Sequence, residues 1–153
     1  MLSRWDITAG YAVLRIVLGI NLAMHGIARL LAGFSMFAGH LSKQFGASML
    51  PASLVAAFVY NLPWAEAALG ILVLFGIFTP PALVAGRLLI AVLSFGSGLI
   101  QDWNAIGIQL LYAAAYALLL AFCRYNVISL DALLNRRRQQ LTTAGTNLGT
   151  SER

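Results

Sequence analysis

Four apolar stretches dominate the chain, and each is long enough to cross a lipid bilayer. They run approximately over residues 7–31, 54–78, 82–100 and 105–122 of the 153 residues. A membrane-spanning helix needs about 20 mostly apolar residues, because a helix rises about 1.5 Å per residue through a hydrocarbon layer about 30 Å thick. Lipid offers no hydrogen-bond partners to the backbone, so each stretch must satisfy its own peptide groups as a helix. The sequence therefore predicts an all-α membrane protein.

Composition supports this fold class and excludes several others. Hydrophobic residues make up 60% of the chain and charged residues only 10%, whereas soluble domains carry about 25% charged residues. These values exclude a soluble globular domain and a disordered chain. The single cysteine, Cys123, excludes a disulfide scaffold and a paired-cysteine redox or zinc site. The net charge is +5, but many basic residues lie within or beside apolar stretches, so we expect no binding to nucleic acid.

The connections between the stretches carry turn residues. Residues 33–51 form the longest connection and are predicted to be a loop, because Gly39 and Gly46 interrupt them. The Thr-Pro-Pro sequence at 79–81 is predicted to end a helix, and residues 101–104 form a short polar turn. Short connections favour antiparallel neighbours. We therefore predict an antiparallel four-transmembrane-helix bundle within residues 1–134.

The C-terminal segment is predicted to begin with a short amphipathic helix. Ser129 can cap it, and its apolar stripe would consist of Leu130, Leu133, Leu134 and Leu141. A basic amphipathic helix typically lies on the anionic cytoplasmic leaflet. Residues 135–153 are predicted to be a basic segment that continues, from Thr142, as a disordered tail.

The positions of the arginines predict the orientation in the membrane. Arg124 and the run Arg136, Arg137 and Arg138 follow the last apolar stretch. Four spans place both termini on one side, and the positive-inside rule makes that side the cytoplasm. We therefore expect a protein integral to the cytoplasmic (inner) membrane, in contact with the lipid bilayer, with both termini cytoplasmic.

Polar residues within the apolar stretches fall on one stripe of each helix. Hydrocarbon penalises an unpartnered polar group by several kcal/mol, so these stripes are expected to face the interior of the bundle. As the only carboxylate at membrane depth, Glu66 is expected to pair with Arg15, Arg87 or both. Excess positive charge favours an anionic or electron-rich guest. The predicted ligand-binding residues are Arg15, His25, Arg29, Glu66, Arg87, Tyr112 and Tyr116.

Other interpretations of these polar residues stay open. Small and polar residues also hold membrane helices together without any ligand, which applies especially to Ser94, Gln109 and the tyrosines. The possible metal ligands are spread over separate segments without close spacing, so we expect no metal site. The sequence contains no self-sufficient catalytic constellation and no phosphate-binding or dinucleotide-binding motif. It therefore leaves open whether the protein is an enzyme.

Four segments together resemble the DoxX family of small four-helix membrane proteins, over most of residues 11–134. They are Leu-Arg-Ile-Val-Leu-Gly at 14–19, His-Gly-Ile-Ala-Arg at 25–29, the glycine-containing segment from Glu66 to Thr79, and Ser-Leu-Asp at 129–131. The family typically shows Lys where this chain has Arg29. The family also closes with the sequence Arg-Tyr-Ser-Leu-Asp. In this chain, three inserted residues separate Arg124 and Tyr125 from the Ser-Leu-Asp part.

The resemblance implies an association with redox complexes. The family takes its name from subunits of archaeal quinol-oxidising and thiosulfate:quinone oxidoreductase complexes. We therefore expect a redox-associated accessory subunit of a larger membrane or redox protein complex, without a covalent cofactor, that binds a quinone in its polar core. Two alternatives stay open: a non-catalytic structural or assembly subunit of a larger membrane complex, and a transporter of a small anion.

Overall fold

The computed structural model describes residues 3–31, 33–46 and 48–150, with side chains described as far as residue 142. Throughout these residues the regular structure is helical, which confirms the all-α prediction. The elements in chain order are α1 (Arg4–Leu31), α2 (Phe34–Phe45), α3 (Ala52–Phe75), α4 (Thr79–Leu99), α5 (Trp103–Ala121), η1 (Cys123–Tyr125) and α6 (Leu130–Thr150).

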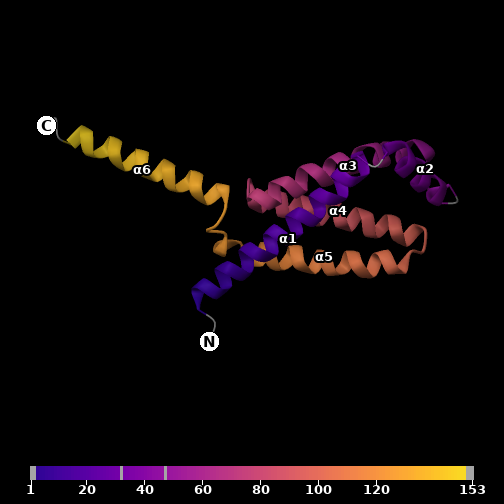
Figure 1. The fold of residues 1–153 in the computed structure, drawn as a ribbon, viewed down its shortest axis with the longest axis horizontal. Helices are drawn as coiled ribbons and strands as arrows, with labels where there is room; N and C mark the ends of the chain where they lie inside the picture. The colour runs from indigo at the N-terminus through magenta and orange to yellow at the C-terminus, as the bar shows by residue number, and fades with distance from the viewer. Residues whose placement is uncertain (1–2, 32, 47, 151–153) are drawn as a thin grey trace.

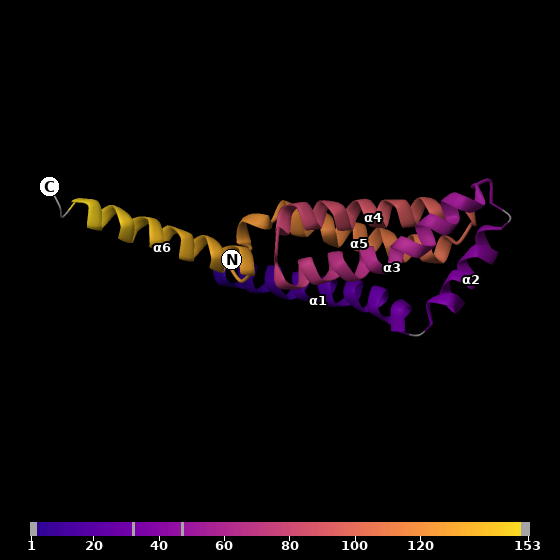
Figure 2. The same cartoon turned by 90° about the horizontal axis from the view of Figure 1, so that it is seen from above.

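Four helices, α1, α3, α4 and α5, are long and apolar enough to cross a membrane. Their bounds lie within three residues of the four predicted spans, so the prediction of four long apolar helices at these positions is confirmed. The four helices pack side by side, while α2 lies at one end of them and α6 extends from the other (Figures 1 and 2). The N-terminus lies at the same end as the beginning of α6 (Figure 2). The large apolar surface of these helices is compatible with contact with a lipid bilayer.

The closest packing joins α1 to α3. A Cβ atom at Gly26 would overlap the backbone of Ala67, and one at Gly70 would overlap the backbone of Ala23. These pairs show that the two helices run antiparallel in one fixed register. Small residues let the backbones approach, as is typical of helix contacts in membranes. This register determines which polar residues of α1 and α3 can meet.

The connection between α3 and α4 ends one helix and begins the next. Gly76 ends α3 in a left-handed conformation with φ of 64°, which glycine adopts without steric cost. The Thr-Pro-Pro sequence at 79–81 was expected to stop a helix, but it forms the first turn of α4 instead. Proline suits this position because the first turn of a helix leaves its N–H groups without intrahelical partners. At the next connection Asp102 caps α5 by accepting a hydrogen bond from the Ala105 N–H at 3.0 Å.

Helix α2 corrects the prediction that residues 33–51 form a loop. Its apolar residues recur at helical spacing, and Phe37, Leu41 and Phe45 pack against Val55 and Val59 of α3. Burial of this stripe outweighs the cost of a glycine within the helix, which is about 1 kcal/mol. Gly39 was therefore misleading as a loop signal, whereas Gly46 directly follows the last residue of α2 as its C-cap. The apolar spacing was the informative pattern.

Helix α6 begins as predicted and continues further than expected. Ser129 caps it, since its Oγ accepts a hydrogen bond from the Ala132 N–H at 3.2 Å. The helix extends to Thr150, where a disordered tail was expected from Thr142; residues 151–153 lie outside the described residues. Residues 130–142 contain no glycine or proline and are rich in leucine, arginine and glutamine, which favour helix. Figure 1 shows α6 projecting away from the four long helices.

Candidate functional site

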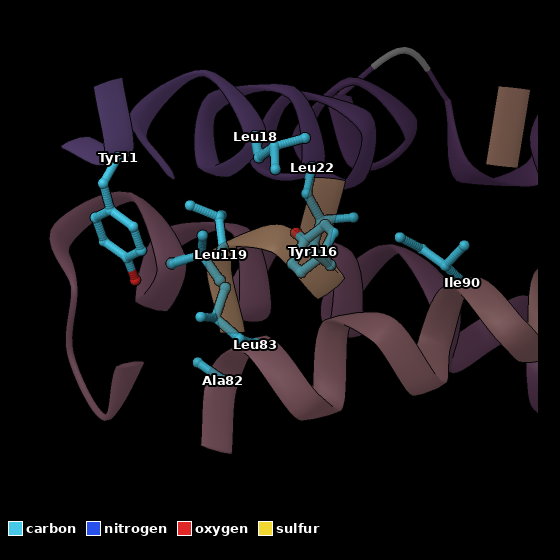
Figure 3. Close-up of a cluster of buried hydrophobic side chains, with 9 residues drawn as sticks. Tyr11, Leu18, Leu22, Ala82, Leu83, Ile90, Tyr116 and Leu119 are labelled. Carbon is cyan, nitrogen blue, oxygen red and sulfur yellow. The ribbon is translucent and has the colours of Figure 1, made fainter. Parts of the chain in front are cut away.

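A cavity of about 210 Å³ lies between α1, α3, α4 and α5. We call it the polar cavity, because it contains five of the seven residues predicted to bind a ligand. Its lining comprises Leu18, Asn21, Leu22, His25, Arg29, Glu66, Ile90, Leu93, Ala105, Ile108, Gln109, Tyr112 and Tyr116. Figure 3 shows Leu18 and Leu22 of α1 facing Tyr116 of α5 at the apolar side of this region. The structure thus brings His25, Arg29, Glu66, Tyr112 and Tyr116 together and leaves Arg15 and Arg87 outside.

The charged centre of the polar cavity is an ion pair between Glu66 and Arg29. The Glu66 side chain is only 1% exposed, whereas that of Arg29 is 28% exposed. An Nη atom of Arg29 donates a hydrogen bond to a carboxylate oxygen of Glu66. The Arg29 guanidinium also lies over the Phe37 ring, 4.8 Å from its centroid. A buried carboxylate needs such a partner, because desolvation of an unpaired charge is costly.

The expectation that Glu66 pairs with Arg15 or Arg87 is therefore wrong, and the α1–α3 register explains why Arg15 is not the partner. The glycine contacts between these helices place Glu66 opposite Ile27. Arg29 lies two residues from that level, within reach of a long side chain. Arg15 lies about 18 Å away along the helix, at 1.5 Å per residue. The sequence alone contained no information on this register.

Arg15 lies instead at the end of α3, where it binds backbone oxygens. Its side chain is 3% exposed. Nη1 donates to the carbonyls of Val73 at 2.7 Å and Leu74 at 2.5 Å, and Nη2 donates to the carbonyl of Ile128 at 2.8 Å. Carbonyls at a helix C-terminus carry partial negative charge and lack intrahelical donors, so a cation stabilises them. Arg15 thereby joins α1, α3 and the segment that leads into α6.

Asp131 of α6 completes this arrangement, which we call the Arg15 junction. Its carboxylate accepts hydrogen bonds from the N–H of Phe78 at 3.0 Å, the N–H of Thr79 at 2.8 Å and the hydroxyl of Thr79 at 2.8 Å. Partial burial works against ionisation of Asp131, but the hydrogen bonds from Thr79 and Phe78 outweigh it and lower the pKa below its ordinary value of 3.8. The Asp131 N–H donates to the Gly76 carbonyl at 3.0 Å. The beginning of α6 is thus attached to the connection between α3 and α4.

Arg87 lies on the exposed side of α4. The buried side of this helix consists of small and apolar residues, including Ala82, Gly86 and Ile90. The prediction that the stripe through Arg87 and Ala91 faces the interior is therefore wrong, since both residues are exposed. Tight packing of α4 needs small residues such as Gly86, beside which the Tyr116 ring lies. A long arginine side chain can extend towards the membrane surface, so its exposure at this depth is tolerable.

Two polar atoms of the cavity-lining residues are buried without a hydrogen-bond partner in the described part of the chain. One is the hydroxyl of Tyr116, whose residue is 2% exposed, and the other is Oε1 of Gln109. Nε2 of Gln109 donates to Ser97 Oγ at 3.1 Å, so only one end of its amide is satisfied. Buried polar atoms in native proteins normally have a protein, water or ligand partner. These atoms therefore suit a guest that forms hydrogen bonds.

The predicted site did not include Asn21 and Gln109, although both line the cavity. Their positions on the polar stripes of α1 and α5 were visible in the sequence. The sequence had favoured a role for Gln109 in contacts between helices rather than in a ligand site. Within the described residues, no group of three or more His, Cys, Asp or Glu side chains could hold a metal ion.

The polar cavity can accept a small polar group. Arg29 and the two tyrosines provide hydrogen-bond donors, while Glu66 and Gln109 provide acceptors. His25 is exposed and lines the same cavity, so the cavity extends to the surface of the protein at that residue. Comparisons of this chain with protein-family models, curated proteins and solved structures found no match.

Proposed function

We propose that this protein is a DoxX-type subunit of the cytoplasmic membrane that binds a quinone headgroup in the polar cavity. The observation that carries the proposal is the cavity itself, in which the Glu66–Arg29 pair lies with the unpartnered Tyr116 hydroxyl and Gln109 oxygen. A quinone headgroup is small and planar, and its carbonyl oxygens accept hydrogen bonds. Arg29 and Tyr116 would donate to these oxygens, and Glu66 would accept a proton from the reduced form.

The proposed topology is an antiparallel four-helix bundle with both termini in the cytoplasm. It is supported by the N-terminus and the beginning of α6 lying at one end of the long helices. Arg124 and the arginines 136–138 belong to that same end, where the positive-inside rule favours the cytoplasm.

The proposed role is that of an accessory subunit. The side chains of the polar cavity can bind, orient and exchange protons with a headgroup, but quinone chemistry also needs a source or acceptor of electrons. We assign that part to a partner complex that carries its own redox cofactor. This chain would hold the quinone for the partner complex.

Binding of a tailless benzoquinone to the purified, detergent-solubilised protein tests the proposal. We expect micromolar or tighter binding by calorimetry, and about tenfold weaker binding by Arg29→Gln, since loss of one charged hydrogen bond costs about 1.5–3 kcal/mol. Arg87→Gln is the matched control, because it removes the same charge from an exposed position outside the cavity. Its affinity should equal that of the wild type. Absence of binding by the wild type, or equal losses in both variants, would overturn the proposal.

The second candidate is a structural or assembly subunit, which the exposed face of α6 favours. Leu133, Leu134 and Leu141 are exposed on this projecting helix. A protein partner could cover them. Copurification with a membrane complex in which no small molecule is bound would favour this function over quinone binding.

A further inference from the structure

A second cavity, of about 460 Å³, lies between α1 and α5. Gly10 and Leu14 of α1 line one side, and the other side is lined by Leu118 of α5 and by Phe122, which directly follows that helix. Most of the lining is apolar. Its polar groups are Asp6, which caps the beginning of α1 by accepting a hydrogen bond from the Ser3 N–H at 2.8 Å, and the buried hydroxyl of Tyr11, which has no hydrogen-bond partner among the described residues. The rest of the lining suits a hydrocarbon chain, and we call this space the apolar cavity.

The apolar cavity and the polar cavity follow each other along the same two helices. On α1, Leu14 of the apolar cavity lies one turn from Leu18 of the polar cavity. On α5, Leu119 of the apolar cavity lies three residues from Tyr116 of the polar cavity, and Figure 3 shows these side chains in one cluster with Leu18. The backbones of α1 and α5 lie further apart than those of α1 and α3, and buried side chains such as Leu18 and Leu119 pack between them. We call this boundary the α1–α5 seam.

The sizes of the two cavities point to one ligand with two parts. Ligand sites usually have volumes of about 300–1,000 Å³, and the polar cavity alone, at about 210 Å³, is smaller. It can hold a headgroup but not the remainder of a larger molecule. The apolar cavity supplies space for that remainder directly along the seam.

We propose that the natural ligand is an amphiphile whose hydrocarbon tail lies in the apolar cavity on the α1–α5 seam while its headgroup lies in the polar cavity. This inference rests on the proposed function of the polar cavity. The seam runs along the helices and therefore along the direction of lipid chains in a bilayer. A tail can enter it sideways from the membrane without the helices separating. Burial of each methylene group then adds to the affinity for the headgroup.

Glycine substitutions allow a test that preserves the fold. Gly10 lines the apolar cavity, and a Cβ atom added there would meet no atom within 4 Å. Gly107 of α5 is equally open but lies outside the apolar cavity, so it provides the matched control. Gly10→Phe should fill the cavity, and Gly107→Phe should not. Gly10→Leu is a milder second variant in case the phenylalanine disturbs the helix.

The measurement compares two probes, a tailless dimethoxy-methyl-benzoquinone and the same quinone with a hexadecyl tail. Gly10 lies twelve residues before Leu22, about 18 Å along α1 at 1.5 Å per residue, and an extended hexadecyl chain spans that distance. In Gly10→Phe, we expect the hexadecyl probe to bind about tenfold more weakly, because more than one methylene loses its burial. The tailless probe should keep its wild-type affinity. Gly107→Phe should change neither affinity. Partition of the hexadecyl probe into detergent acts equally on all variants and does not affect this comparison.

The outcomes separate this inference from the proposed function. If neither probe binds the wild type, the proposed function fails. If both probes bind and Gly10→Phe weakens neither, or weakens both equally, the tail site fails while headgroup binding stands. Loss of a copurifying phospholipid from Gly10→Phe, with unchanged binding of the hexadecyl probe, would assign the cavity to bulk lipid and would also overturn the inference.

Discussion

Two arginines on one face of α1 have opposite surroundings. Arg15 is 3% exposed, and its guanidinium binds three backbone carbonyls at the Arg15 junction. Arg29 is 28% exposed, and it pairs with Glu66 at the edge of the polar cavity. The partners of Arg15 are backbone atoms that hold helices in place, whereas the partner of Arg29 is a side chain beside free volume. An intramembrane charge therefore indicates a ligand site only when its surroundings leave room for a guest.

The comparison assigns different tasks to the two ends of the helical unit. The Arg15 junction connects α1, the end of α3, the beginning of α4 and α6 through backbone contacts. Changes there should affect stability first. The polar cavity retains polar atoms without partners, so changes there should affect binding first. Variants at each end test this distinction.

The largest effect is expected for Arg15→Gln. This change removes a buried cation and leaves the carbonyls of Val73, Leu74 and Ile128 without their donor. Hydrogen bonds to charged groups contribute about 1.5–3 kcal/mol each, so the free energy of unfolding should fall by at least about 3 kcal/mol. Denaturation of the detergent-solubilised protein, followed by circular dichroism, measures this loss.

Arg87→Gln is the control for that measurement, because it removes the same charge from an exposed position. Its free energy of unfolding should stay within about 0.5 kcal/mol of the wild type, as for most exposed substitutions. If Arg15→Gln and Arg87→Gln lower the free energy of unfolding equally, the claim that Arg15 is structural and Arg87 is not would be refuted. If neither loses stability, the Arg15 junction does not stabilise the fold.

A smaller effect is expected for the Glu66–Arg29 pair, and a double-mutant cycle isolates it. Glu66→Gln and Arg29→Gln should each lower the free energy of unfolding, and together they should lower it by less than the sum. Coupling of about 1–3 kcal/mol is typical of residues in direct contact. The matched cycle of Glu66→Gln with Arg87→Gln should be additive within about 0.5 kcal/mol. Additivity in the first cycle, or coupling in the second, would contradict the observed pairing.

The sequence was sufficient to predict the four helices that are long and apolar enough to cross a membrane. Length and continuous hydrophobicity determine such helices, since the backbone has no other way to satisfy its polar groups in lipid. Helix α2 was missed because Gly39 and Gly46 were given more weight than the spacing of Phe37, Leu41 and Phe45. Glycine disfavours helix and the apolar spacing favours it, and packing of the apolar residues against α3 stabilises the helix.

The sequence was not sufficient to predict which charged side chains pair. Glu66 could meet any arginine at a comparable depth, and only the contacts of Gly26 and Gly70 between α1 and α3 select Arg29. The buried face of α4 was also undetermined, because a helix in lipid can expose apolar residues on every side. Arg87 thus faces outward, while Gly86 beside it faces Tyr116. Helix registers and rotations depend on contacts between distant residues, which one sequence does not reveal.

The smallest expected effect concerns Asp131, and its pH dependence further tests the Arg15 junction. Hydrogen bonds from Thr79 and Phe78, with a contribution from Arg15, lower the pKa of Asp131 below 3.8 in the folded protein. The ionised carboxylate therefore stabilises the fold fully at pH values above the pKa that Asp131 has in the unfolded chain. This contribution disappears as the pH falls through the lower pKa of the folded state. Asp131→Asn should lower the free energy of unfolding by about 1 kcal/mol near neutral pH. The difference from the wild type should shrink below pH 3.8. Unfolding curves of both proteins across this range measure it.

In an Arg15→Gln background the effect of Asp131→Asn should also be smaller, because the junction that orders the beginning of α6 is already weakened. A difference that stays constant from neutral to acidic pH would show that the charge of Asp131 does not contribute to the junction.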